Sequence, residues 1–438
     1  MPVQAGPASV RTGRCHDQRP ASGVHGVLPP QHRLAACLGR VPDVSDVTHT
    51  PAPLPARPGL SIPHLHDAIT LLRTLSGPQG IHASLTGTAN YRAIFARDGV
   101  MAGLAGLLLH DDVITAGLVR TLEGLRDTQG TEGQVASNFL LAEGQPPQVS
   151  FGTLAPRIDG ATWYLLGVAL AARAGAIDPR QFAASVQAAV RVLDALEYNG
   201  RHLVYVPTGG NWADEYIYDG YILYDQVLRA WALRLLAVTY DVPAWQVKAA
   251  AIAARIEDSY APPEGAARAY PVASFSPVSR RHIFDLAACS LLALSDVAPT
   301  LSDAAMDWIA SQFLAAHRLP PAFDPVIDEG DADWPALRRY HLHEFRNRPH
   351  EYHNGGVWPI WVGWLALALA HTGRHEDLQR LTRLTVTALT RTTTYGFEEY
   401  FHGATGDSLG TPQMAYSATG IVFLEHADST AARALFSA

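Results

Sequence analysis

From residue 65 onward, two kinds of helical segment alternate along the chain. Six segments are apolar nearly all round, and six are amphipathic, with polar residues on one face only. A helix that is apolar on every side must be buried, whereas an amphipathic helix covers a surface. Six buried helices that alternate with six covering helices predict an inner ring wrapped by an outer ring.

The alternation defines the predicted fold class. The apolar segments are Gly99–Leu109, Ala161–Leu170, Tyr221–Leu233, Phe284–Leu294, Val357–Leu369 and Met414–Leu424. The amphipathic segments are Leu65–Leu75, Val113–Leu125, Phe182–Leu196, Val242–Ile256, Ala304–Leu314 and Leu378–Leu389. The units recur about every sixty residues, as a helical-hairpin repeat requires. We therefore predict an all-α protein with an (α/α)6 barrel over residues 61–438; an irregular helical domain or an open solenoid is the alternative.

Composition narrows the class of partner. Of the 438 residues, 48% are hydrophobic and only 17% are charged, as expected for helices buried on every side. The formal net charge of -8 argues against a nucleic-acid partner, which would require a basic surface. The longest apolar stretch, Val357 to Ala370, is too short to cross a membrane and contains Pro359. A small-molecule or oligosaccharide substrate, uncharged or mildly polar, fits best, and the sequence leaves the oligomeric state open.

The cysteines and the first residues bear on location. Cys15, Cys37 and Cys289 lie far apart and form no CxxC pair, so we predict neither disulfides nor a zinc site, and a cytoplasmic protein. Residues 1–60 are rich in Pro, Arg, Gly and His and have no helical period. They contain no apolar segment of a secretory signal. We interpret them as a disordered tail or an upstream extension, with a transit peptide as the alternative.

Polar and aromatic residues gather just before five of the apolar segments. Helices joined by short loops run antiparallel, so the N-termini of all six inner helices meet at one rim. The clusters are Tyr91–Gly99, Pro156–Trp163, Gly209–Tyr221, His350–Trp358 and Glu398–Gly410. No comparable cluster precedes an amphipathic segment. Unusual loops on one rim predict a binding site at that rim.

The residue types in these clusters suit carbohydrate recognition. Aromatic rings stack on the apolar faces of sugars, while amides and carboxylates bond the hydroxyl groups. The clusters contain no cationic patch. The predicted stacking residues are Trp163, Trp212, Trp358 and Tyr400, and the predicted hydroxyl partners are Asp98, Gln226 and Asn354. Glu215 is also predicted to contact the substrate.

Glycosidic cleavage needs two carboxyl groups on opposite sides of the bond. The best acid is Asp214, directly before the third inner helix, where Trp212 and Glu215 are expected to raise its pKa through desolvation and like-charge repulsion. The best base is Glu399, before the sixth inner helix. The third and sixth helices of a six-membered ring face each other, so these two carboxylates are predicted to form a pair.

Other interpretations compete at several positions. An Asp near a helix start is often an N-cap, and we interpret Asp159 and Asp219 mainly in this way, while keeping Asp159 among the residues that could contact substrate. Four histidines lie in one long polar segment without HExxH spacing, so we predict no metal site and no cofactor. They are His341, His343, His350 and His353.

Four motifs, in this order along the chain, resemble the neutral/alkaline invertases and the amylo-α-1,6-glucosidase domains of glycogen-debranching proteins. They are Ala96-Arg97-Asp98-Gly99, Asn211-Trp212-Ala213-Asp214, His353-Asn354-Gly355-Gly356-Val357-Trp358-Pro359 and Glu399-Tyr400-Phe401-His402-Gly403. Both groups are six-hairpin (α/α)6 glycosidases. Asn211 and Glu215 depart from the invertase pattern, which has Asp and Arg there, and Phe401 and His402 replace Tyr and Asp.

The resemblance implies a role for each matched residue. Asp214 would be the general acid and Glu399 the base of an inverting hydrolysis. Arg97 and Asp98 would hold hydroxyl groups of the terminal sugar. His353, Asn354 and Trp358 would shape its pocket.

The sequence therefore predicts an inverting, exo-acting glycosidase that cleaves an α-glucosidic bond in a small or branched glucoside without a cofactor. One alternative is a sugar epimerase of the same barrel, which would use His343, His350 or His353 with His282 on the opposite wall. Another is a carbohydrate-binding protein that has lost catalysis. The presence of both Asp214 and Glu399 argues against the latter.

Overall fold

The computed structural model describes residues 62–437, except for 87–88, 143, 198–199, 342–343 and 392–393. All of them fall in one unit of the chain, Gly59–Ala438. The interpretation of residues 1–60 as a tail lies outside the described residues. So do Cys15, Cys37 and His343.

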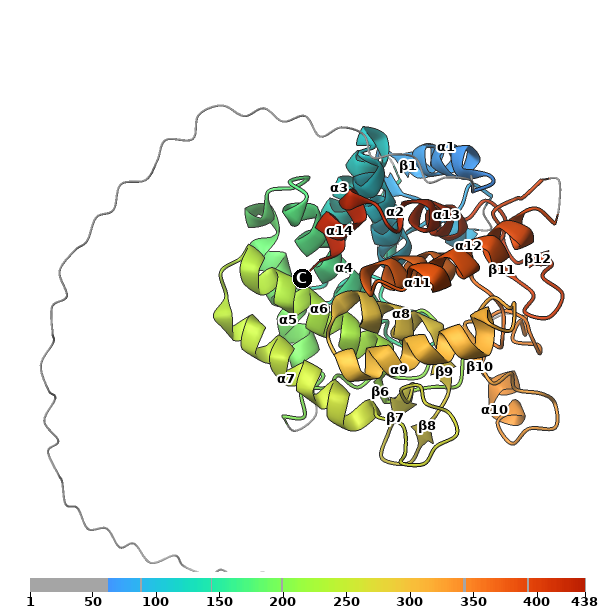
Figure 1. The fold of residues 1–438 in the computed structure, drawn as a ribbon. Coiled ribbons are helices and arrows are strands. Elements are labelled where there is room, and N and C mark those ends of the chain that lie inside the picture. The colour runs from blue at the N-terminus through green and yellow to red at the C-terminus, as the bar shows by residue number, and fades with distance from the viewer. Residues whose placement is uncertain are drawn as a thin grey trace, which may run out of the picture. The chain divides into compact units, whose positions relative to one another are not determined.

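Six buried helices form a closed inner ring (Figure 1). They are α2 (Ala96–Leu109), α4 (Asp159–Arg173), α6 (Leu223–Thr239), α8 (Leu286–Ser295), α11 (Pro359–His371) and α13 (Ala415–His426). Each packs against the next in this order, and α13 packs against α2. The ring closes because each helix is apolar on both flanks and can bury two neighbours. All six segments predicted to be buried are confirmed.

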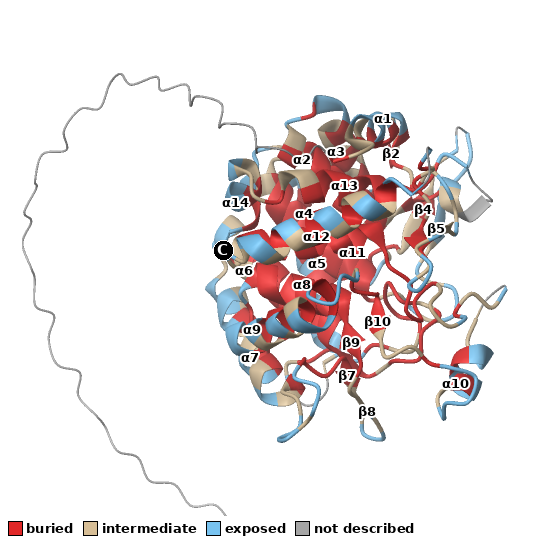
Figure 2. Ribbon diagram, turned by 45° about the vertical axis from the view of Figure 1, so that its right-hand side comes forward, coloured by how far each residue is buried: buried red, intermediate tan, exposed pale blue. Residues whose placement is uncertain are grey.

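Six amphipathic helices cover the ring. They are α1 (Leu65–Leu75), α3 (Asp112–Asp127), α5 (Ala183–Ala195), α7 (Pro243–Tyr260), α9 (Pro299–Ile309) and α12 (His375–Leu389). Five of them pack on the inner helix that precedes them, and α1 packs on α13, so the first and last helices of the barrel meet. Figure 2 shows the contrast, since α11 is buried throughout whereas α12 alternates between buried and exposed residues. The (α/α)6 barrel is confirmed.

Short antiparallel strands fasten the loops of the barrel. They are β1 (Ser76–Gly77), β2 (Gly80–Ile81), β3 (Ile94–Phe95), β4 (Asn138–Leu140), β5 (Gln148–Ser150), β6 (Tyr221–Ile222), β7 (Ser274–Phe275), β8 (Arg280–Arg281), β9 (Phe284–Asp285), β10 (Phe323–Asp324), β11 (Tyr400–Phe401) and β12 (Ser408–Leu409). The pairings are β1–β2, β3–β4–β5, β6–β7–β8, β9–β10 and β11–β12. Strands β3, β6 and β9 lead directly into inner helices, so backbone hydrogen bonds fix the chain where each helix begins.

Several helix boundaries differ from the prediction. Tyr221 and Phe284 were predicted to be helical, but they lie in strands β6 and β9, whose aromatic and branched residues suit a pleated surface. Helix α11 begins at Pro359 rather than Val357, because proline is favoured in the first helical turn. The predicted helix Ala304–Leu314 changes to a π-helical turn at Ala310–Leu314. Further short helices are η1 (Ala89–Arg92), η2 (Pro179–Phe182), α10 (Trp334–Arg339) and α14 (Thr430–Phe436).

The close approach between α11 and α13 supplies a stability prediction. A Cβ atom on Gly420 would collide with the backbone carbonyl of Pro359, and one on Gly363 would lie 2.6 Å from the carbonyl oxygen of Gly420. We expect Gly420→Ala to lower the free energy of unfolding by about 1–3 kcal/mol, because the added methyl group would clash with backbone atoms of α11 and force the two helices apart. Urea denaturation measures this. Gly330→Ala is the control, since a Cβ there meets nothing within 4 Å; equal stability of the two variants would contradict the packing argument.

Candidate active site

The predicted clusters lie at the N-terminal ends of the inner helices, and they supply buried carboxylates. Asp98 is in the first turn of α2, Asp159 is the first residue of α4, and Asp225 is in the first turn of α6. Helix N-termini favour negative charge, which helps this rim to hold them. A separate cavity of about 340 Å³ lies among Leu107, Arg173 and other residues at the opposite ends of α2 and α4, away from the carboxylate rim.

The segment that carries Asp214 is anchored by Asn211. The side-chain oxygen of Asn211 accepts a hydrogen bond from Ala213 N at 3.1 Å, and its amide nitrogen donates to Asp225 at 3.0 Å and to Tyr218 at 3.2 Å. Asn211 is buried, whereas the side chain of Asp214 keeps 27% of its accessible surface. The turn therefore holds the Asp214 backbone firmly and leaves its carboxyl group open to a ligand.

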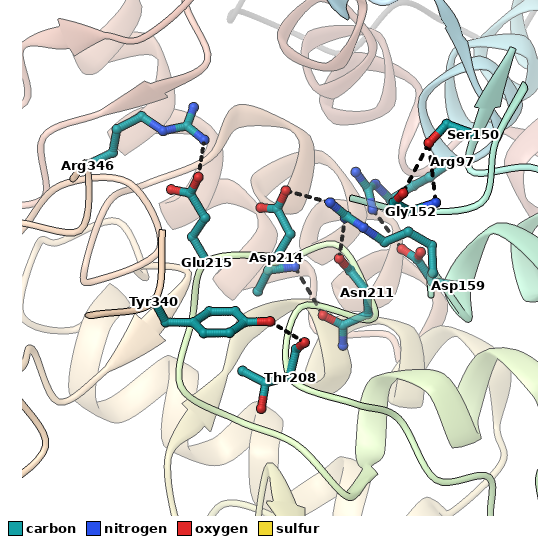
Figure 3. Close-up of polar contacts among 12 residues, drawn as sticks. Arg97, Ser150, Gly152, Asp159, Thr208, Asn211, Asp214, Glu215, Tyr340 and Arg346 are labelled. Carbon is teal, nitrogen blue, oxygen red and sulfur yellow. Dashed lines mark hydrogen bonds and ion pairs between the residues drawn. The ribbon is translucent and has the colours of Figure 1, made fainter. Parts of the chain in front are cut away.

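The carboxylate of Asp214 is paired with Arg157. The guanidinium Nη2 donates to Asp214 Oδ2 at 2.6 Å. Burial has the largest effect on the pKa of Asp214 and raises it, but the charge and hydrogen bond of Arg157, together with the charge of Arg346, help to hold the pKa below its usual value. The predicted rise of this pKa is therefore wrong. Glu215 is turned toward Arg346, 3.3 Å away, and Figure 3 shows that Asp214 and Glu215 point in different directions.

The carboxylate of Glu399 has different partners. Tyr91 donates its hydroxyl proton to Oε1 at 2.9 Å, and the backbone N–H of Thr411 donates to Oε2 at 3.1 Å. Burial raises the pKa of Glu399, Arg346 lowers it, and the negative charge of Asp214 adds to the rise. A Cβ on Gly410 would lie 2.6 Å from Oε2, so only glycine fits beside this carboxylate.

Arg97 and Asp98 form a buried group beside this pair. Arg97 Nη1 donates to Asp159 Oδ2 at 2.7 Å, and its Nε donates to the hydroxyl of Tyr416. Asp98 Oδ2 lies 3.7 Å from Arg97 Nη2 and accepts no hydrogen bond within the described part of the chain. A buried carboxylate oxygen without a donor is suited to accept one from a substrate hydroxyl.

The cap interpretation of Asp159 and Asp219 is wrong. Asp159 makes no capping hydrogen bond to α4 and is instead the ion-pair partner of Arg97. Asp219 precedes α6 by several residues, and its carboxylate accepts a hydrogen bond from Tyr205 at 3.5 Å. Strand β6 separates Asp219 from the helix.

Asp98 supplies a prediction about pH and stability. Burial raises the pKa of Asp98 to about 6, above the value of about 3.9 in an unfolded chain. A raised carboxyl pKa favours the folded state below the unfolded pKa, and this contribution is lost as pH rises through about 6. We therefore expect Asp98→Asn to stabilise the protein more at pH 7 than at pH 4. The changes in the free energy of unfolding at the two pH values should differ by roughly 1–3 kcal/mol. Urea denaturation at both pH values measures the difference; equal effects at both would contradict the assigned shift.

An aromatic group lies on the same rim. Trp212 stacks on Phe323, and Trp358 stacks on Tyr400 and on His353. Both ring nitrogens of His353 lack a hydrogen-bond partner among the described residues, and burial lowers its pKa to about 3. His353 is thus a neutral ring that can both donate to and accept from a ligand.

Three predicted substrate contacts lie behind the site instead. Trp163 is fully buried and donates its indole N–H to Tyr224 at 2.7 Å. Gln226 bonds the backbone N–H and carbonyl of Val204, both at 2.9 Å. Asn354 bonds the backbone of Ile327 in the same way, at 2.8 Å for both groups. Because their polar atoms are already bonded, we assign Trp163, Gln226 and Asn354 to support of the rim.

The sequence analysis missed the residues that control the two carboxylates. Arg157, Arg346, Tyr91 and Thr411 were not singled out. The clusters were predicted to contain no cationic patch, but Arg157 and Arg346 form ion pairs with Asp214 and Glu215. Arg346 lies 3.9 Å from the ring centroid of Tyr352 and lowers the pKa of Glu399. Arg157 and Tyr91 lie inside the predicted polar clusters, and this position could have pointed to both residues. Arg346 and Thr411 lie outside the clusters.

No described helix is long and apolar enough to cross a membrane. Within the described ranges, no group of three or more His, Cys, Asp or Glu residues is placed to hold a metal ion. His282 bonds the carbonyl of Tyr270 at 3.2 Å.

Solved structures share the fold. The GH63 mannosylglycerate hydrolase from Thermus thermophilus in complex with glucose superposes with a TM-score of 0.58 at 16% identity, covering 82% of this chain and 99% of that one. The same enzyme with Tris and D-glycerate gives 0.56 at 14%, with the same coverage. A bacterial glucoamylase complexed with acarbose gives 0.57 at 12%, covering 83% and 55%. No curated protein matches.

A family model gives a more specific result. The model of the mannosylglycerate hydrolase MGH1-like glycoside hydrolase domain matches residues 58–418, which is nearly the whole barrel. The predicted enzyme class, a glycosidase, is thereby confirmed, while the closer resemblance to invertases and debranching proteins stays a prediction. The chain belongs to the mannosylglycerate hydrolase MGH1-like glycoside hydrolase family.

Proposed function

We propose that this glycoside hydrolase inverts the anomeric carbon of a small α-glycoside, with Asp214 as general acid and Glu399 as general base. The observation that carries the proposal is the pair of carboxylates before α6 and α13, the third and sixth helices of the inner ring. Each has its own donors, and the charge of Asp214 acts on Glu399. Inversion requires the two groups to stand about 6.5–9.5 Å apart, with water between them and the sugar.

Burial raises the pKa of Glu399 above its usual value, whereas the polar groups around its carboxylate act in the opposite direction and suit a base. The hydroxyl of Tyr91 and the N–H of Thr411 both donate to its carboxylate, and hydrogen bonds of this kind favour the ionised form. Arg346 adds a positive charge nearby. An ionised Glu399 would accept a proton from water as that water attacks the sugar.

The substrate is proposed to have one terminal sugar and a small aglycone. Arg97, Asp98 and the neutral ring of His353 would bond the sugar hydroxyls, and Trp212 and Trp358 would pack against its apolar faces. Arg157 and Arg346 beside the acid favour an aglycone that carries negative charge, and one structural neighbour was solved with D-glycerate bound. We therefore add α-glucosides whose aglycone is a small carboxylic acid to the small or branched glucosides predicted from the sequence.

Proton NMR of the reaction tests the proposal. The purified protein would be incubated with sucrose, isomaltose, a branched maltodextrin, glucosylglycerate and mannosylglycerate. We expect the β-anomer of the sugar to appear first from one of these α-glycosides, and Asp214→Asn to abolish its release. First release of the α-anomer would contradict inversion.

The alternatives receive less support. An epimerase would need two opposed histidines, but His353 is held neutral by burial and His282 is bonded to the backbone of Tyr270. Interconversion of free sugars without any hydrolysis would favour the epimerase. Tight binding of a panel compound without turnover would favour a binding protein.

A further inference from the structure

The ion pair between Arg157 and Asp214 conflicts with the proposed role of Asp214. A general acid must carry a proton when the leaving oxygen departs, whereas a guanidinium at 2.6 Å stabilises the ionised carboxylate. Arg157 Nη1 also donates to the carbonyl of Asn211 at 2.7 Å, so Arg157 joins the segment before α4 to the segment that carries Asp214. The ion pair thus holds Asp214 in the form that cannot act as the acid.

The Nε nitrogen of Arg157 is left for a ligand. Its Nε–H is buried and has no hydrogen-bond partner among the described residues, while the side chain as a whole keeps 11% of its accessible surface. A buried donor without a partner is costly and is expected to be satisfied when the site is filled. The planar fork of a guanidinium matches a carboxylate with two parallel hydrogen bonds.

Among the described residues, Arg157 is the cation that forms an ion pair with Asp214, while the charge of Arg346 also lowers the pKa of Asp214. The remaining titratable or charged groups that act on Asp214, or on which it acts, come from the other rim segments: Tyr340, Arg346, Tyr352, His353 and Glu399. Arg346 is turned to Glu215 at 3.3 Å. His353 is neutral because burial lowers its pKa to about 3. Separation from Arg157 would therefore remove the paired cation and raise the pKa of the Asp214 carboxyl group.

We propose that Arg157 is a counter-ion that the substrate displaces: a carboxylate on the aglycone takes over the Arg157 guanidinium, and Asp214 then takes up one proton from solvent and becomes the general acid. The inference rests on the proposed function and makes Arg157 a positioning residue that couples a negatively charged aglycone to the protonation of the acid. The proton taken up by Asp214 is the one later given to the leaving oxygen.

Calorimetry with D-glycerate, and with glycerol as the uncharged comparison, tests this without turnover. Titrations near pH 6 in buffers of different ionisation enthalpy count the protons exchanged on binding. We expect D-glycerate to bind with net uptake of up to about one proton and glycerol to bind at least about tenfold more weakly without uptake. Asp214→Asn should bind D-glycerate without proton uptake.

Variants of Arg157 complete the experiment. Arg157→Gln should weaken D-glycerate binding by roughly tenfold to hundredfold and abolish proton uptake, because a charge-assisted contact is lost. Arg157→Lys keeps the positive charge and replaces the glutamine variant in the experiment if that variant unfolds. It should bind D-glycerate weakly and still take up a proton. The matched control is Arg281→Gln, which removes a rim ion pair with Asp333 of 2.7 Å and should leave binding unchanged.

Three results would overturn the inference. They are the absence of D-glycerate binding, D-glycerate binding without proton uptake, and unchanged binding and uptake in Arg157→Gln. Each is distinct from failure of the proposed function, which is measured by anomer release. If the protein hydrolysed a neutral glycoside but did not bind D-glycerate, the proposed function would stand and the proposed displacement of Arg157 would be rejected.

Discussion

Asp214→Asn is expected to lower kcat/KM for the best natural glycoside by about 10³-fold, because proton transfer to the leaving oxygen is lost. The same variant should keep most of its activity on the glycosyl fluoride of the same sugar, since fluoride leaves without a proton. Steady-state kinetics on the two substrates measures both effects. The amide is close in shape to the carboxyl group, so the turn held by Asn211 should be preserved.

Asp219→Asn is the matched control for this experiment. Asp219 lies on the same connection between α5 and α6, but its carboxylate contacts Tyr205 rather than the site. We expect its kinetics to equal those of the wild type. An Asp214→Asn enzyme that loses the fluoride reaction as completely as the glycoside reaction would contradict the acid role and favour Asp214 as the base.

Glu399→Gln is expected to lower kcat/KM by about 10³-fold on the glycoside and on the glycosyl fluoride alike, because activation of water is needed in both reactions. The contrast with Asp214→Asn therefore separates the base from the acid. The hydrogen bonds from Tyr91 and Thr411 can still reach the glutamine oxygen, so loss of structure is not the expected cause. Circular dichroism would check that both variants fold.

The neighbouring Glu398 supplies the control for Glu399. Its charge acts on Tyr395, and its backbone carbonyl accepts a hydrogen bond from Ser417. Glu398→Gln should therefore keep wild-type turnover. If Glu398→Gln lost activity and Glu399→Gln kept it, the base would have been assigned to the wrong member of the pair.

The rim combines stability costs with function. Asp98 is buried beside a single ion-pair partner and has a pKa of about 6, and Asp285, the N-cap of α8, has a pKa of about 7 because of burial. Their ionised forms destabilise the folded state at neutral pH. A buried charge of this kind is retained where the group is held for a ligand. For this reason Asp98→Asn is expected to stabilise the protein and to weaken substrate binding.

The sequence by itself determined the barrel. Burial of a helix depends on the pattern within one segment, and the alternation of apolar and amphipathic segments predicts an inner and an outer layer, which the packing of α13 on α2 closes into a ring. The position of the candidate site followed as well, because clusters that precede inner helices must share one rim. Asp214 and Glu399 were singled out from their place before the third and sixth inner helices, a property of chain order.

Only the tertiary structure decided what surrounds these carboxylates. Arg157 is 57 residues from Asp214 along the chain, and Tyr91 is 308 residues from Glu399. A pKa depends on charges and burial within a few ångströms, so local sequence suggested Trp212 and Glu215 as the causes, whereas the fold brought Arg157 instead. Trp163, Gln226 and Asn354 were misplaced for the same reason: a side chain's partner is set by packing between distant segments, which no local pattern records.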